Sequence, residues 1–131
     1  MKKILILLIF INLCSGCGIV QSYNVYKAHK SAKESYFGNP PSEEAITGSE
    51  ESIRRSFKDP DSAIFDWQPP YRCVYPSGFD VSYGWCAYVY INAKNSFGGY
   101  TGYRKWLTLW ERNHLVYYTY FSADMDKVKE F

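Results

Sequence analysis

Several features that announce a function in other chains are scarce in this sequence. Its 131 residues include only two His and four Cys, and acidic and basic residues nearly balance. Two of the 15 basic residues, Lys2 and Lys3, lie among the first sixteen, and 13 basic residues then face 13 acidic ones. A neutral chain with scattered charges lacks the basic patch that binds nucleic acid or anionic lipid. We therefore expect no nucleic-acid partner.

Catalytic and metal-binding motifs are also missing. Cys73 and Cys86 are separated by twelve residues and the two His lie far from them, which matches no zinc-ligand spacing. A thiol nucleophile with His114 as its base is an alternative, but nothing around either Cys resembles a catalytic signature. The sequence predicts no metal site, no cofactor and no catalytic residue.

The apolar run near the N-terminus is too short to cross a bilayer. Residues 4–13 would span ~15 Å as a helix, against ~30 Å of hydrocarbon. The run follows Met1-Lys2-Lys3 and precedes Ser15-Gly16-Cys17, the arrangement of a secretory signal. Residues 1–16 are therefore predicted to be a signal peptide.

The segment around Cys17 resembles the lipobox of bacterial lipoproteins. The resemblance rests on Ser15-Gly16 before the cysteine, and Cys14 departs from it because the pattern prefers Leu there. It implies that the Cys17 thiol is acylated and that Cys17 becomes the mature N-terminus. Gly18, in place of Asp, implies the outer membrane if the host has two membranes. Ordinary signal cleavage and a retained short anchor are the alternatives.

Cleavage leaves Cys73 and Cys86 in an exported, oxidising compartment. An even pair of cysteines there predicts a disulfide. Placed directly opposite each other on neighbouring strands, the two residues centre the chain reversal on Phe79-Asp80, next to Pro76-Ser77-Gly78.

The remaining chain divides into a lipidated tether, residues 17–41, and a small α+β domain, residues 42–131. We expect one amphipathic helix, beginning at Ser42 or Ser49 and ending at Lys58, packed on an antiparallel sheet of four or five strands. The cations at its end fit the helix dipole and are interpreted as a solvated face rather than a phosphate-binding patch: Arg54, Arg55 and Lys58.

Beyond Pro60 the apolar residues alternate with period two, which is typical of strands. Strands are expected over residues 62–67, 72–75, 81–92, 103–110 and 115–120, with a short helix or frayed tail over 124–131. Hairpin turns are placed on Gly98-Gly99 and Arg112-Asn113. The first of these registers sets Ile91 opposite Trp106 and Val89 opposite Thr108.

These registers give the sheet two unlike faces. One carries Val89, Ile91, Trp106 and Trp110 and is expected to lie under the helix. The other collects four tyrosines as a candidate partner-binding surface: Tyr88, Tyr90, Tyr118 and Tyr120. The alternative is that residues 23–37 or the C-terminal tail cover this second face as an ordinary core layer.

Two stretches resemble a group of small, uncharacterised bacterial exported proteins and lipoproteins. One is Phe57-Lys58-Asp59-Pro60-Asp61-Ser62-Ala63-Ile64-Phe65, and the other runs from Asn92-Ala93-Lys94-Asn95 through Gly98-Gly99-Tyr100-Thr101-Gly102-Tyr103. The resemblance implies no activity or ligand. By its own composition the second stretch is either a hairpin held by Asn side chains or a recognition loop with Asn95 and Tyr100 as candidate binding residues.

The resulting hypothesis is a lipid-anchored envelope protein that acts as a non-catalytic binding or accessory module. Its partners would be the membrane, through the lipid, and an envelope protein or a cell-wall glycan. The rival hypotheses are a cell-wall-directed hydrolase or other envelope enzyme without a recognisable motif, and a purely structural lipoprotein.

Lipidation at Cys17 predicts a simple labelling result. Replacing Cys17 with Ser should abolish incorporation of a labelled fatty acid and release the protein from the membrane fraction, because no apolar run long enough to span the bilayer remains. Cys14→Ser is the matched control and should leave labelling intact. Labelling that survives in Cys17→Ser contradicts the assignment.

Overall fold

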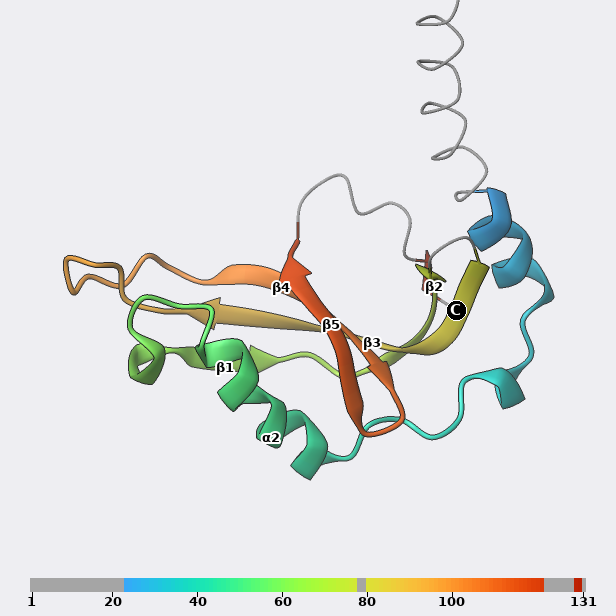
Figure 1. Ribbon diagram of the computed structural model, residues 1–131, viewed down its shortest axis with the longest axis horizontal. Helices are drawn as coiled ribbons and strands as arrows, with labels where there is room; N and C mark the ends of the chain where they lie inside the picture. The colour runs from blue at the N-terminus through green and yellow to red at the C-terminus, as the bar shows by residue number, and fades with distance from the viewer. Residues whose placement is uncertain (1–22, 78–79, 122–128, 131) are drawn as a thin grey trace, which may run out of the picture.

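A computed structural model describes residues 23–77, 80–121 and 129–130, in which six strands form one antiparallel sheet (Figure 1). The strands are β1 (Ile64–Trp67), β2 (Tyr71–Ser77), β3 (Asp80–Asn92), β4 (Arg104–Glu111), β5 (His114–Tyr120) and β6 (Lys129–Glu130). Their order is β5-β4-β3-β2-β6, and β1 pairs with β3. The α+β class and the antiparallel sheet are therefore as expected.

Two α-helices pack on the sheet where one was expected. Helix α1 covers residues 23–31, and α2 (Glu43–Arg54) begins at Ser42, whose hydroxyl accepts a hydrogen bond from the Ala45 amide. Two 3₁₀ turns, η1 (Glu34–Tyr36) and η2 (Pro60–Ser62), follow the helices. Helix α1 lies at one end of the molecule and α2 nearer its middle, and each covers part of the same sheet face (Figure 1).

Strand β3 is the common partner of three other strands. It pairs with β4 along one edge, and with β2 and then β1 along the other. Pro69-Pro70 separates β1 from β2 because proline has no amide hydrogen to give to the ladder. The Gln68 amide still donates to the Tyr88 carbonyl at 2.9 Å, so the break in the edge is short.

The segment expected to be a tether belongs to the folded unit from residue 23 onward. Val25 and Phe37 are buried against Val74 of β2, on the same face that α2 covers further along. The indole nitrogen of Trp85 donates to the Phe37 carbonyl at 3.1 Å. The alternative that residues 23–37 cover the tyrosine-bearing face is therefore wrong. The signal peptide and Cys17 lie outside the described residues.

Cys73 and Cys86 form the predicted disulfide between β2 and β3, with their Cα atoms 5.8 Å apart. They are diagonal neighbours rather than directly opposed, since Cys73 faces Gly84 and Tyr71 faces Cys86. The predicted direct pairing was therefore wrong by two residues. A loop of this length stabilises a fold by ~3 kcal/mol on the chain-entropy estimate.

The β3–β4 register is also shifted by two residues from the prediction. Val89 faces Trp106 and Ile91 faces Arg104. The reason lies in the loop: the Gly98 amide donates to the Asn95 carbonyl, which centres the turn on Ser96-Phe97 in place of Gly98-Gly99. This alone would shift the register by four residues, and the irregular pairing around Lys94 and Tyr100 takes up two of them. A shift of two keeps every side chain on its expected face.

A bulge in the β4–β5 pair changes which face the later residues of β5 occupy. The turn on Arg112-Asn113 is as predicted, and Trp110 faces Leu115, but Leu109 then faces Tyr117. Val116 is the extra residue of the bulge, so the residues after it exchange faces. Tyr118 therefore lies on the helix-covered face, which contradicts its predicted position.

The last described residues form strand β6, which pairs with β2, whereas a helix or tail was expected for residues 124–131. The rest of that segment lies outside the described residues. Within the described ranges, neither α1 nor α2 has the length and apolarity that a membrane span needs.

Gly84 allows the sheet to close tightly around β3. A Cβ at this position would collide with the Trp110 carbonyl oxygen and lie 3.3 Å from Cε1 of Tyr75. The missing side chain lets the Tyr75 ring pass across β3, where its hydroxyl donates to Glu111 of β4 at 3.0 Å. Gly48, in the middle of α2, has open space instead.

The two glycines predict opposite effects of the same substitution. Gly84→Ala should lower the free energy of unfolding by about 1–3 kcal/mol, because the Trp110 backbone cannot move away easily. Gly48→Ala is the control and should raise it by about 0.5–1 kcal/mol through helix propensity. Urea unfolding measures both, and a harmless Gly84→Ala would contradict this account.

Candidate functional site

The β3–β4 hairpin ends in a loop that projects from one end of the molecule (Figure 1). We call residues 93–103 the hairpin end. Its backbone is held by the side chains of two asparagines. Asn95 Oδ1 accepts from the amides of Phe97 (2.9 Å) and Gly99 (3.1 Å), and Asn92 Oδ1 accepts from the Gly102 amide (3.0 Å). Gly98 and Gly102 have φ angles of 81° and 89°, which other residues adopt only under strain.

This ordered backbone presents aromatic side chains to solvent. Phe97 is 96% exposed at the tip, and Tyr100 and Tyr103 are about half exposed. The Lys94 ammonium lies 5.4 Å from the centre of the Tyr100 ring, so that ring is held on one side. An exposed aromatic on a preformed turn loses little entropy when a partner covers it, which favours binding.

A cleft of about 340 Å³ lies at the base of the hairpin end. We call it the basic cleft; Phe57, Lys58, Lys94, Arg104, Trp106 and Tyr120 are among its lining residues. Residues 57–65 and 92–103, the two stretches singled out in the sequence, meet here. The Ser62 hydroxyl of the first accepts from the Lys94 amide of the second at 2.9 Å and donates to the Asp59 carbonyl at 2.7 Å.

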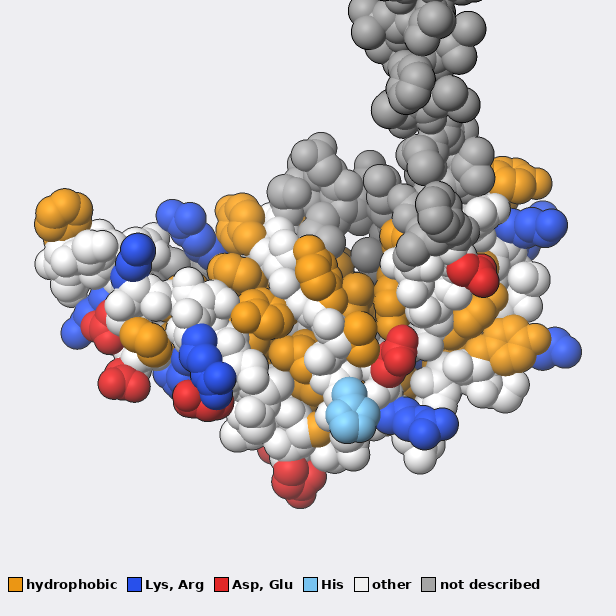
Figure 2. Space-filling model, in the orientation of Figure 1, with side chains coloured by type: hydrophobic (Ala, Val, Ile, Leu, Met, Phe, Trp, Pro, Cys, Tyr) orange, Lys and Arg blue, Asp and Glu red, His pale blue; other side chains and the backbone are white. Residues whose placement is uncertain are grey.

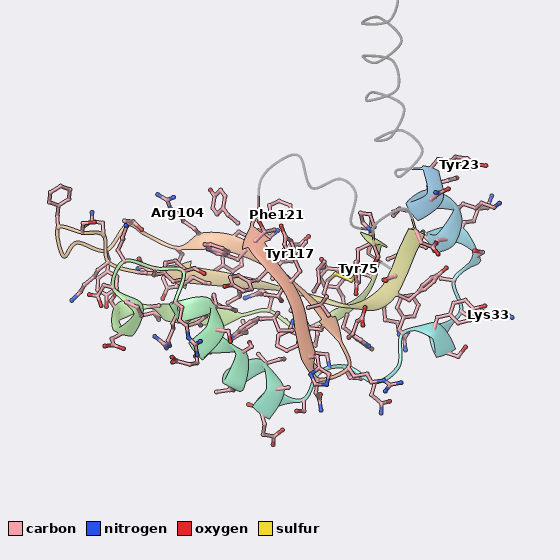
Figure 3. All side chains as sticks on the ribbon, in the orientation of Figure 1. Tyr23, Lys33, Tyr75, Arg104, Tyr117 and Phe121 are labelled. Atoms are coloured by element: carbon pink, nitrogen blue, oxygen red, sulfur yellow. A yellow bond between two sulfur atoms is a disulfide. The ribbon has the colours of Figure 1, made fainter. Side chains whose placement is uncertain are left out.

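The cations at the end of α2 are paired with carboxylates or carbonyls, whereas those that line the basic cleft form no ion pair with a described residue. Arg54 bonds the carbonyls of Pro60 and Ala63 and pairs with Glu50, and Arg55 pairs with Glu51. These two cations stabilise the end of α2, in line with the structural interpretation. Lys58 is different, because it lines the cleft together with Arg104. Figure 3 labels Arg104 at the start of β4.

The four tyrosines predicted to share one face do not share it. Tyr88 and Tyr90 lie on the second face, where Tyr88 packs on Tyr71 with ring centres 5.5 Å apart. Tyr118 lies under α2 and its hydroxyl donates to the Ser52 carbonyl at 3.3 Å. Tyr120 packs on Trp106 and lines the basic cleft. The predicted four-tyrosine surface is therefore wrong.

Three of the six predicted binding residues nevertheless gather at one place. Asn95, Tyr100 and Tyr120 all lie at the hairpin end or its basic cleft. The sequence argument missed Lys58, which was assigned to a solvated helix face, and Trp106, which was assigned only to the core. The sequence did not give the correct β3–β4 register. An error of two residues in that register conceals which side chains lie next to the loop.

Hydrophobic side chains also gather over β4 and β5 (Figure 2). On the second face the Lys105 ammonium lies 3.6 Å from the centre of the Tyr88 ring and 4.5 Å from that of Phe121. Phe121 meets Tyr88 edge to face at 5.5 Å. The aromatic rings of Tyr88 and Phe121 and the ammonium of Lys105 therefore contact one another.

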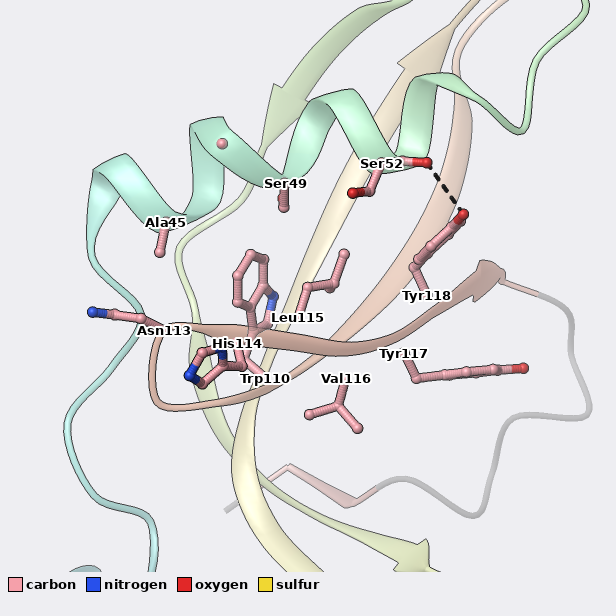
Figure 4. A pocket seen from close by; sticks show the side chains of 11 residues that line it. Ala45, Ser49, Ser52, Trp110, Asn113, His114, Leu115, Val116, Tyr117 and Tyr118 are labelled. Carbon is pink, nitrogen blue, oxygen red and sulfur yellow. Dashed lines mark hydrogen bonds between the residues drawn. The ribbon is translucent and has the colours of Figure 1, made fainter.

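A second groove, of about 600 Å³, lies between α2 and β5 (Figure 4). His114 lines its end, and Ser49, Ser52 and Tyr118 lie along it. Hydroxyls and one histidine resemble catalytic components, but among the described residues His114 has no hydrogen bond to a carboxylate. The Ser49 hydroxyl donates to the Ile46 carbonyl at 2.6 Å, as is ordinary within a helix.

Tyr75 and Glu111 form a phenol–carboxylate pair near the other end of β4. Burial, then the hydrogen bond to Glu111 and its negative charge, raise the pKa of Tyr75 far above its usual range. The hydroxyl therefore stays protonated at neutral pH and serves as a donor, which suits a structural role better than that of a base.

Glu111 and His114 line a third cleft, of about 610 Å³. No hydrogen bond joins these two side chains among the described residues, and the Glu111 carboxylate accepts from the Tyr75 hydroxyl instead. Asp59, Asp61 and Asp66 line none of the three clefts. Across residues 23–77, 80–121 and 129–130 no three His, Cys, Asp or Glu side chains cluster as metal ligands would. Comparisons with protein-family models, curated proteins and solved structures gave no match to this chain.

The raised pKa of Tyr75 predicts an alkaline effect on stability. Folding keeps the proton that the unfolded chain loses above pH ~10, so the contribution of Tyr75 is complete below that pH and lost as the pH rises further. Tyr75→Phe should cost about 1 kcal/mol at pH 8 and progressively less from pH 10 to 11 in urea unfolding. Tyr103→Phe, at an exposed site, should show no such change. A cost that stays constant with pH would contradict the pKa assignment.

Proposed function

We propose that this chain is a non-catalytic binding module of the bacterial cell envelope, anchored through a lipid on Cys17. The binding surface is the hairpin end together with the basic cleft. The observation that carries the proposal is the tip, where a nearly fully exposed Phe97 stands on a loop whose backbone is already ordered. A fold gains no stability from such a side chain, whereas a binding partner would.

Separate observations support the placement of the protein in the cell envelope. The short apolar run, the lipobox resemblance and the Cys73–Cys86 disulfide are each typical of an exported protein. If the host has two membranes, Gly18 after Cys17 favours the outer one. A cell-wall glycan or an envelope protein is the partner that such a location supplies.

The hairpin end predicts which aromatic residues matter for binding. Phe97→Ala combined with Tyr100→Ala should weaken binding to the envelope fraction of the host cells by about tenfold or more, because exposed aromatics dominate interface energetics. The melting temperature should not change, since Phe97 is 96% exposed. Co-sedimentation with the fraction and thermal unfolding measure the two effects.

Tyr117→Ala is the matched control, since Tyr117 is 51% and Tyr100 50% exposed. An equal loss of binding in both variants would contradict the location of the surface, and no binding by the wild type would contradict the function. Binding that survives protease treatment of the envelope fraction indicates a glycan partner, and binding that does not indicates a protein.

A further inference from the structure

We infer that the basic cleft binds an acidic sugar, that is, a sugar ring carrying a carboxylate or phosphate group. The inference rests on the proposed binding function of the hairpin end and specifies its ligand. It follows from three features of the cleft: the charges at its rim, the aromatic rings of its floor, and an indole nitrogen that has no acceptor among the described residues.

The rim carries three cations, and none of the described residues that line the cleft is acidic. Lys58 follows α2, Lys94 stands at the base of the hairpin and Arg104 begins β4. Neither Lys58 nor Arg104 forms an ion pair with another described residue. Within the part of the chain that the structure describes, these cations from three separate segments have no acidic partner, so their charge is available to an anion. Arg104 also offers a fork suited to two oxygens.

The floor of the cleft is aromatic. Trp106 meets Phe57 at 5.6 Å and Tyr120 at 6.0 Å between ring centres, both edge to face. A small inorganic anion would leave these rings unused. A sugar ring can lay its C–H groups on them while its hydroxyls reach Ser56 and Thr101, which also line the cleft. The volume of about 340 Å³ is at the small end for ligand pockets and suits a mono- or disaccharide.

Trp106 is the exception among the four tryptophans. The indole nitrogens of Trp67, Trp85 and Trp110 donate to Glu50 Oε1, the Phe37 carbonyl and Thr108 Oγ1 at 2.9, 3.1 and 2.9 Å. Nε1 of Trp106 is buried and has no acceptor among the described residues. A buried donor of this kind is uncommon and calls for an explanation. Because this nitrogen has almost no contact with solvent, a ligand oxygen would supply the acceptor only once a neighbouring side chain of the floor moves aside.

A matched set of sugars tests the inference on the full chain in detergent micelles by isothermal titration calorimetry. The carboxylate pair is the disaccharide of N-acetylglucosamine and N-acetylmuramic acid against the neutral dimer of N-acetylglucosamine. The phosphate pair is N-acetylglucosamine 1-phosphate against N-acetylglucosamine. We expect the anionic member of at least one pair to bind about tenfold more tightly, and less tightly as salt is added.

Variants of single cations test the location. Lys58→Ala and Arg104→Ala should each weaken binding of the anionic sugar by about fivefold. Arg55→Ala is the control, since it removes the same charge from the same segment but Arg55 does not line the cleft. Trp106→Phe keeps an aromatic floor and removes Nε1, and should weaken anionic and neutral sugars alike.

Three results would overturn the inference: equal affinity for anionic and neutral sugars, an equal loss in Arg55→Ala and Lys58→Ala, or binding to phosphatidylglycerol vesicles without binding to any sugar. If the protein still sediments with the envelope fraction through Phe97 and Tyr100, the binding function stands and only the ligand is wrong. If the protein binds neither the envelope fraction nor any of the sugars, both proposals fail.

Discussion

Strand β3 has to satisfy three partner strands at once, and the architecture follows from that requirement. Its thirteen residues pair with β4 on one edge and with β2 and β1 in series on the other. Two strands can share an edge only if the chain between them leaves the ladder, which Pro69-Pro70 ensures. Because Gly84 has no side chain, the Trp110 backbone and the Tyr75 ring can approach β3 closely. The Cys73–Cys86 disulfide links β2 to β3 beside this position. The result is a narrow sheet, extended along β3, whose far end carries the hairpin loop.

The bulge after Leu109 has the largest effect on the surface. One extra residue turns the later side chains of β5 over, so that Tyr118 reaches α2 and Tyr120 reaches Trp106. Without it, the two tyrosines would stand beside Tyr88 and Tyr90 on the second face. The basic cleft therefore owes part of its aromatic wall to an irregularity of the sheet, in keeping with the frequent position of bulges next to functional sites.

Much of the fold could be predicted from the sequence because its signals are local. Alternation of apolar residues located β3 and β4, proline pairs marked the breaks, and an exported pair of cysteines gave the disulfide. Long-range pairing was less accessible. The Asn95 side chain decided the turn that set the β3–β4 register, and no residue near Val116 signals a bulge. The packing of Val25 and Phe37 on the sheet depends on space left uncovered by α2, which no local pattern reveals.

The packing of α1 also bears on how the molecule stands above a bilayer. If Cys17 carries the lipid, five residues lie between it and Tyr23, and the six residue steps from Cys17 to Tyr23 reach at most about 20 Å. The linker between the lipid and α1 is then short, and it would keep the α1 end close to the lipid headgroups. The hairpin end lies at the opposite end of the long axis (Figure 1). With the α1 end held there, the aromatic tip is the described part of the molecule that could reach furthest from the bilayer.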